Sequence, residues 1–176
     1  MKIFLDTEFT GLHQKTTLIS LAMITETGLK FYAEFLDYDV RQIDGWIQEN
    51  VLKHLYHLNK RKKIKSDSLL YSVIGKTEYV FEHMVKWLQQ FNSDKIEIWS
   101  DCLAYDWVLF CELFGGAISL PDYIDYIPYD ICTLFKIKGI DPDISREKFV
   151  ESKKTNKHCS LDDAIIIKQC YEKLIR

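Results

Sequence analysis

The segment Lys2-Ile-Phe-Leu-Asp-Thr-Glu-Phe9 has the pattern of a β-strand from residue 2 to residue 9. Apolar residues occur at both odd and even positions of this segment, which is typical of a strand buried on both faces. Alternate residues of a strand point to the same side, so Asp6 and Glu8 face one way with backbones about 6–7 Å apart. Unpaired carboxylates buried there would cost several kcal/mol, whereas a shared divalent cation would neutralise them. The alternative is a pair of solvated acids where the strand ends at a wet edge.

The rest of the chain predicts an α/β sheet flanked by helices, because a strand meander is followed by alternating helix and strand. The 176 residues fit one domain, 1–176, with no linker rich in Pro, Gly or Ser. Further strands are expected at 18–25, 30–37, 95–100 and 124–130, and helices at 39–57, 77–91, 102–113, up to 135, and 161–174. Residues 25–28 are expected to form a hairpin turn, and 58–68 a loop.

The charge balance excludes a protein that coats nucleic acid through a global positive field. Lys and Arg total 23 against 26 Asp and Glu, a formal net charge of −3, and such a field would on average repel phosphate. A protein that binds the end of one nucleic-acid strand through metal ions is compatible with this charge balance. No apolar run reaches the roughly 20 residues of a membrane span. The five cysteines form no CxxC pair and are expected to be reduced thiols, which predicts a cytoplasmic protein.

Asp106 is the second candidate acid. It lies among apolar residues in a predicted helix that follows a strand ending near Ser100, and Asp101 fits the N-cap of that helix. An acid in such surroundings is a candidate inward-facing ligand. The alternative, which is favoured when Asp106 is taken alone, places it on the exposed stripe of the helix.

The third group of polar residues is His158-Cys-Ser-Leu-Asp-Asp163, at the start of the last predicted helix. Ser160 and Asp163 fit a capping box, which is a purely structural explanation. That explanation does not account for the histidine. His158 could accept a proton near neutral pH, and Asp163 in the first helical turn could reach a cation while the helix dipole favours its charge.

The order and spacing of these three groups resemble the DEDD exonuclease superfamily, and a histidine five residues before the last acid marks its DEDDh branch. Residues 6–12 resemble the first motif, Ala104-Tyr-Asp-Trp107 the second, and 158–164 the third. Residues 129–134 resemble the acid-bearing strand end that precedes the third motif. The compact bacterial, mycobacterial-type 3′–5′ exoribonucleases are the most similar group. One departure is Ser100-Asp101-Cys102, where many members carry His-Asn.

The resemblance implies an RNase H-like fold with a mixed sheet of five strands, the second antiparallel. It implies that Asp6, Glu8, Asp106 and Asp163 hold two Mg²⁺ or Mn²⁺ ions, and that His158 is the general base. The expected reaction releases nucleoside 5′-monophosphates from the 3′ ends of single-stranded nucleic acid or from 3′ overhangs. RNA is favoured over DNA on resemblance alone. Related enzymes are often dimers, so a homodimer is a further expectation.

Substrate contacts are carried over from the resemblance as well. Phe9 and Leu12 are expected to pack against the 3′ base, with core packing as the alternative for Phe9, and the Thr7 backbone is expected near the terminal sugar. Lys157, with Lys153 and Lys154, adjoins His158 and could steer phosphate. The basic run 60–65 is expected to be a solvated surface loop, with contact to the upstream strand, across a dimer, as its functional alternative.

Two other functions compete with a nuclease. Asp6-Thr-Glu-Phe-Thr10 resembles the acid loop of haloacid dehalogenase-type phosphatases, with Asp6 as nucleophile and Asp162-Asp163 as a late acidic pair. Glu8 departs from that pattern, which needs aspartate there, and neither Asp106 nor His158 would have a role. The second competitor is a nucleic-acid-binding module that has lost its chemistry, which the presence of all four acids and the histidine disfavours.

Overall fold

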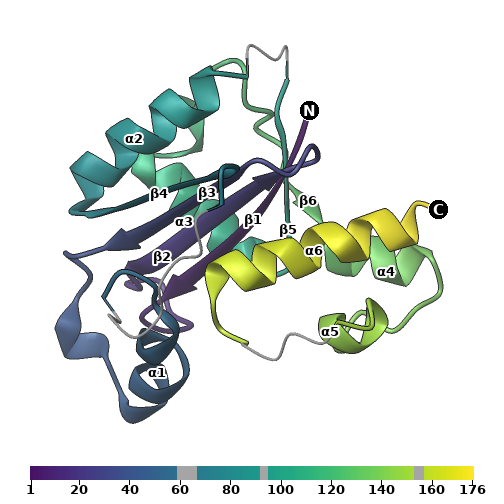
Figure 1. Ribbon diagram of the computed structural model, residues 1–176, viewed down its shortest axis with the longest axis horizontal. Coiled ribbons are helices and arrows are strands. Elements are labelled where there is room, and N and C mark those ends of the chain that lie inside the picture. Colours follow the sequence, from purple (N-terminus) through teal and green to yellow (C-terminus); the bar gives the residue numbers. More distant parts are fainter. Residues whose placement is uncertain (59–66, 92–94, 153–156) are drawn as a thin grey trace.

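The computed structural model describes residues 1–58, 67–91, 95–152 and 157–176, and its centre is a six-stranded mixed sheet (Figure 1). The strand order is β4-β3-β2-β1-β5-β6. β2 runs antiparallel to both of its neighbours, and the other pairs are parallel. The strands are β1 (Lys2–Phe9), β2 (Leu18–Thr25), β3 (Lys30–Phe35), β4 (Leu70–Gly75), β5 (Glu97–Ser100) and β6 (Tyr129–Asp130).

Helices flank both faces of this sheet (Figure 1). The α-helices are α1 (Gly45–Asn50), α2 (Thr77–Gln89), α3 (Leu103–Leu113), α4 (Ile131–Ile137), α5 (Arg146–Phe149) and α6 (Ser160–Leu174). Three 3₁₀ turns complete the described elements, η1 (Val40–Gln42), η2 (Leu52–His54) and η3 (Ala117–Ser119). The expected α/β class, with an antiparallel second strand and flanking helices, is confirmed.

The alternation of β1 divides the core between the two faces. Ile3 and Leu5 pack into the cluster formed with α2 and α3. Phe4 packs on the opposite face against α4 and α6. Asp6 and Glu8 are two and four residues after Phe4 on the same strand. Their carboxylates therefore point to the same face as Phe4, which is the face covered by α6.

The expected five strands are one too few, because β4 was not predicted. Its sequence, Leu70-Tyr-Ser-Val-Ile-Gly75, is short and only Val73 and Gly75 are buried. β4 lies at the edge of the sheet and pairs in parallel with β3. Such a strand depends on a partner supplied by tertiary structure, which a local pattern does not reveal.

The predicted helix at 39–57 is interrupted. Asp39 accepts a hydrogen bond from the Arg41 N–H and begins η1, and Asp44 accepts one from the Ile47 N–H and begins α1. Two capping aspartates therefore start separate turns. The apolar residues spaced four apart in this segment still face the core, because Ile47 and Val51 are buried in one cluster.

Smaller differences concern the second half of the chain. β6 covers only Tyr129–Asp130 of the expected 124–130, while Ile124 forms an isolated bridge with Ile96. The short helix α5 was not predicted. All five cysteines are free, as expected. Among the described residues, no helix is long and apolar enough to cross a membrane. The basic run 60–65, Lys153 and Lys154 lie outside the described residues.

Candidate active site

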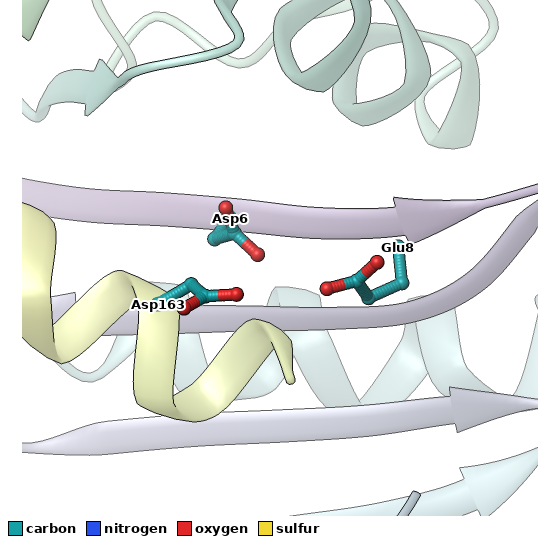
Figure 2. A group of neighbouring side chains, drawn as sticks. All are labelled: Asp6, Glu8 and Asp163. Carbon is teal, nitrogen blue, oxygen red and sulfur yellow. The ribbon is translucent and has the colours of Figure 1, made fainter. Parts of the chain in front are cut away.

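Three acids converge between β1 and the first turn of α6. Asp6, Glu8 and Asp163 each offer a carboxylate oxygen, and these oxygens all lie within 4.8 Å of one another. Figure 2 shows the three side chains directed towards the same space. Asp6 and Glu8 are buried and Asp163 is partly buried. The strand parity and the start of α6 therefore bring together groups that are about 155 residues apart in the chain.

Local contacts place the start of α6 above this part of the sheet. The hydroxyls of Ser20 on β2 and Ser160 lie 2.9 Å apart and are hydrogen-bonded. The N-cap of α6 is Cys159 rather than Ser160, because the fully buried Ser160 hydroxyl is bound to Ser20. Asp163 Oδ2 accepts the Cys159 N–H at 3.2 Å. The capping box predicted for Ser160 and Asp163 is therefore wrong, because the carboxylate binds the N–H of Cys159 and the Ser160 hydroxyl binds Ser20.

Asp106 is fully buried but is not one of the three convergent acids. Its Oδ1 accepts the Thr7 hydroxyl at 2.6 Å and the Thr7 N–H at 3.2 Å. Its Oδ2 accepts the Ser100 hydroxyl at 2.7 Å. Asp106 thus faces inward, as the ligand hypothesis required, and in this structure it joins α3 to β1 and β5.

Burial and repulsion among carboxylates dominate the electrostatics of Asp6 and Glu8. Burial, followed by repulsion from the other carboxylates, raises the pKa of Asp6 and of Glu8 well above the usual range. Burial raises the pKa of Asp106 and of Asp163 to about 7. Buried carboxylate oxygens that repel one another are suitable ligands for a hard divalent cation, so these residues fit the metal that the sequence implied.

The three convergent acids Asp6, Glu8 and Asp163 line a cavity with a volume of about 910 Å³. His158 lines this cavity as well. Its backbone is left-handed, with a φ of 60°. Burial first, and then the charge of Lys157, lower the pKa of its imidazole. The neutral form, which can accept a proton, is therefore favoured at neutral pH.

Trp46 on α1 was not singled out from the sequence, yet it contacts this histidine. Its ring lies edge-on to that of His158, with centroids 4.9 Å apart, and 54% of Trp46 is exposed. It lines the same cavity. The one available signal was a large aromatic residue two positions after the Asp44 cap and next to the buried Ile47.

The residues expected to contact substrate also line this cavity: Thr7, Phe9, Leu12 and Lys157. Leu12 is 73% exposed. Phe9 is partly buried and stacks on Tyr105 with centroids 5.1 Å apart. Lys157 Nζ is 3.8 Å from Glu147 Oε1.

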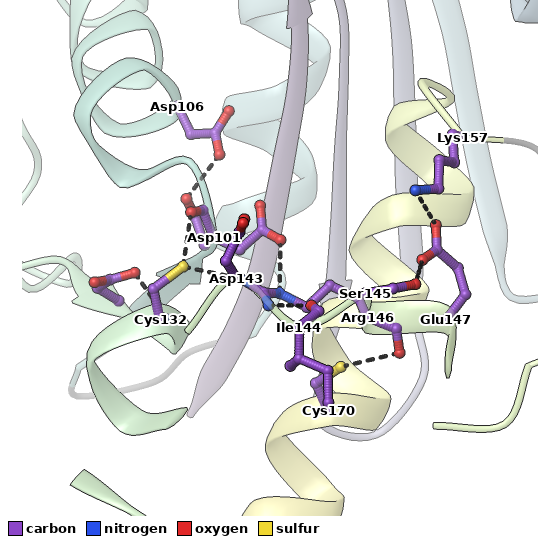
Figure 3. Close-up of polar contacts among 12 residues, drawn as sticks. Asp101, Asp106, Cys132, Asp143, Ile144, Ser145, Arg146, Glu147, Lys157 and Cys170 are labelled. Carbon is purple, nitrogen blue, oxygen red and sulfur yellow. Dashed lines mark hydrogen bonds and ion pairs between the residues drawn. The ribbon is translucent and has the colours of Figure 1, made fainter. Parts of the chain in front are cut away.

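Arg146 forms a polar network beside the acids (Figure 3). This network was not predicted from the sequence. Its Nε donates to Asp101 Oδ2 at 3.2 Å, Nη1 to the Ile144 carbonyl at 2.7 Å, and Nη2 to Cys132 Sγ at 3.0 Å. The predicted N-cap role of Asp101 is wrong: Cys102 is the N-cap of α3, because Asp101 is drawn to Arg146 instead. Burial raises the pKa of Asp101 although Arg146 opposes the rise. No motif marks this pair, whose members are 45 residues apart.

Comparison with known proteins adds an independent finding. The family model described as the 3′–5′ exoribonuclease Rv2179c-like domain matches residues 1–175. Two curated proteins of Mycobacterium tuberculosis are similar to this chain, the 3′–5′ exoribonuclease Rv2179c of strain H37Rv and the 3′–5′ exoribonuclease MT2234.1 of strain CDC 1551. Each is 26% identical over 144 residues, which cover 79% of this chain and 76% of the relative.

Proposed function

The chain belongs to the Rv2179c-like 3′–5′ exoribonuclease domain family and is an enzyme of that class, and we propose that it is a metal-dependent nuclease of DEDDh type. Its proposed substrate is the 3′ end of single-stranded RNA, or a 3′ overhang, and its products are nucleoside 5′-monophosphates. The observation that carries the proposal is the convergence of Asp6, Glu8 and Asp163 within 4.8 Å, in the cavity that His158 also lines.

The topology supports an RNase H-like fold in one domain, 1–176. Without the edge strand β4, the order β3-β2-β1-β5-β6 is a five-stranded mixed sheet with an antiparallel β2. The acids then lie on the central strand β1 and on the helix that covers it. Because β4 is added outside β3, it changes the strand count without changing the surroundings of the acids.

In the proposed mechanism, Asp6, Glu8 and Asp163 hold divalent ions, with Asp106 as the fourth acid of a two-ion site. Mg²⁺ or Mn²⁺ held by these residues would neutralise negative charge on the phosphate and would lower the pKa of a bound water. The charge of Asp106 already acts on Asp6 and Glu8. Thr7 gives Asp106 both its N–H and its hydroxyl, so we assign Thr7 to holding this acid in place.

His158 is the proposed general base. Its lowered pKa favours the neutral imidazole, which can take a proton from water as the phosphodiester is cleaved. The Trp46 ring packs edge-on against this imidazole. Lys157 is the only one of the three predicted phosphate-steering lysines within the described residues, and 63% of its side chain is exposed.

The terminal base is proposed to lie against the apolar part of the cavity wall, formed by Phe9, Leu12 and Trp46. A cavity of about 910 Å³ is at the upper end of the range typical of small-molecule sites. Stacking on an aromatic side chain is worth roughly 1–3 kcal/mol per base and does not depend on base identity. These contacts would therefore favour a 3′ end of any sequence.

The direct test is incubation of 5′-labelled linear and circular single strands of RNA and DNA with Mg²⁺ or Mn²⁺. We expect a ladder that shortens from the 3′ end of the RNA and stops with EDTA. Asp6→Ala and His158→Ala should abolish it. The matched controls are Asp122→Ala, at an exposed loop position, and His83→Ala on α2, remote from the cavity; both should keep full activity. Cleavage of circular RNA would contradict exonuclease action.

Assays on the same purified protein distinguish the nuclease from the two competing functions. Hydrolysis of p-nitrophenyl phosphate through a phosphorylated Asp6 would support the phosphatase hypothesis instead. Binding of RNA without cleavage under any metal would support the inactive module. Sedimentation of the purified protein would test the predicted homodimer, and fractionation of cells would test the predicted cytoplasmic location.

A further inference from the structure

A further buried acid, Glu34 on β3, lies on the same face of the sheet as the proposed active site. Glu8 on β1 pairs with Ser20 on β2, and Ser20 pairs with Glu34 on β3. Glu34 is fully buried and lies two strands, about 10 Å, from Glu8 across the sheet. Ser20, between them, is the residue that binds the start of α6. No predicted motif and no step of the proposed mechanism uses Glu34.

Glu34 and Tyr32 hold three successive backbone groups of the segment that follows η2. Glu34 Oε1 accepts the Tyr32 hydroxyl at 2.7 Å and the His57 N–H at 2.7 Å, and Oε2 accepts the Leu58 N–H at 2.9 Å. The Tyr32 oxygen in turn accepts the Tyr56 N–H at 3.5 Å. Burial and the neighbouring Glu34 raise the pKa of Tyr32 well above its usual value, so its hydroxyl keeps the proton that it donates.

Tyr56 links the segment held by Glu34 and Tyr32 to the turn before α6. Its ring lies edge-on to that of Tyr32, with centroids 5.3 Å apart, and packs against the cluster that contains Cys159 and Leu161. Burial first, and then the electrostatic and hydrogen-bonding influence of the Cys159 and Asp162 side chains, raise the pKa of the Tyr56 hydroxyl. These two residues are the immediate neighbours of His158 and Asp163.

We propose that Glu34 and Tyr56 are positioning residues of the nuclease site, which act through the turn that carries His158 and Asp163; this inference rests on the proposed function. His158 needs such a restraint because its left-handed backbone, with a φ of 60°, is unfavourable for a residue other than glycine unless its surroundings impose it. Tyr56 contacts this turn from the segment that follows η2, and α6 itself packs against β1 and β2.

The test compares Tyr56→Phe and Glu34→Gln with the wild type. Tyr56→Phe keeps the ring and removes only the hydroxyl. Tyr71→Phe is the matched control, because it also removes a bonded hydroxyl, that of Tyr71 to His83 at the far edge of the sheet. Hydrogen–deuterium exchange of the peptide 157–165 in the metal-free protein measures the restraint. kcat and KM on a 5′-labelled RNA with Mn²⁺ measure its consequence.

We expect Tyr56→Phe to speed exchange of residues 159–163 about tenfold and to lower kcat about tenfold, with KM changed less than twofold and thermal stability close to that of Tyr71→Phe. Glu34→Gln should change exchange and kcat in the same direction, and adding Tyr56→Phe to it should have little further effect. Unchanged exchange, or faster exchange with unchanged kcat, would overturn the inference. A wild type that leaves RNA intact would refute the proposed function, while the exchange measurement would still decide whether Tyr56 restrains the turn.

Discussion

Replacing Asp163 by asparagine should stabilise the metal-free protein while destroying its activity. Asp163 is a carboxylate surrounded by other acids, and burial raises its pKa from 3.8 to about 7. Asparagine has nearly the same shape, carries no charge, and keeps an oxygen that can accept the Cys159 N–H. The substitution therefore removes repulsion at little cost in packing or hydrogen bonding.

The size and the sign of the effect follow from the raised pKa. A group with a raised folded-state pKa binds its proton more tightly in the folded protein, so its contribution to stability is complete below about pH 4 and is lost as the pH rises towards about 7. The pKa difference corresponds to roughly 4 kcal/mol at high pH, which is the upper limit for the gain. We expect Asp163→Asn to gain roughly 1–4 kcal/mol at pH 8 and much less at pH 4.

Urea denaturation in EDTA at pH 4, 6 and 8 measures this gain, with Asp122→Asn as the control for the loss of one exposed negative charge. Added Mn²⁺ should then stabilise the wild type, by about 2.7 kcal/mol at a hundredfold excess over its dissociation constant, and leave Asp163→Asn nearly unchanged. The reasoning fails if Asp163→Asn is no more stable than the wild type at pH 8 in EDTA. It also fails if the gain does not grow with pH.

Three further substitutions test other parts of the site. Arg146→Gln leaves the partly buried Asp101 without its ion-pair partner and should lower the free energy of unfolding by roughly 1–3 kcal/mol. Asp101→Asn in the same chain should restore most of this loss, and urea denaturation measures both effects. Trp46→Ala should raise the KM for RNA about tenfold with little change in melting temperature, because Trp46 is 54% exposed and stacking is worth roughly 1–3 kcal/mol; an unchanged KM would remove it from the base site. Phe9→Ala should instead lower the melting temperature as well as raise KM, since Phe9 stacks on Tyr105, and calorimetry with steady-state kinetics separates the two effects.

The positions of several site side chains on their strand or helix could be predicted from the sequence alone, because they depend on local pattern. The alternation of residues 2–9 predicted that Asp6 and Glu8 share one face, and the helix predicted at 161–174 put Asp163 in its first turn. In the structure Asp163 does lie in the first turn of α6, which begins at Ser160. Both conclusions rest on periodicity, which the backbone geometry of strand and helix dictates wherever the element lies. The apolar stripe of α2 was found in the same way, and its buried residues include Val80 and Met84.

Contacts between distant segments were decided only by the tertiary structure. The edge strand β4 exists because β3 offers it a partner. Asp101 caps no helix because Arg146, 45 residues later, binds it, and Asp106 is held by Thr7, 99 residues earlier. Glu34 and Tyr56 carry no signal of their own, since their effect depends on which segments the sheet brings side by side. Local periodicity determined which way each acid points, whereas the packing of β1, α3 and α6 determined which acids meet, because that depends on burial and pairing across the whole chain.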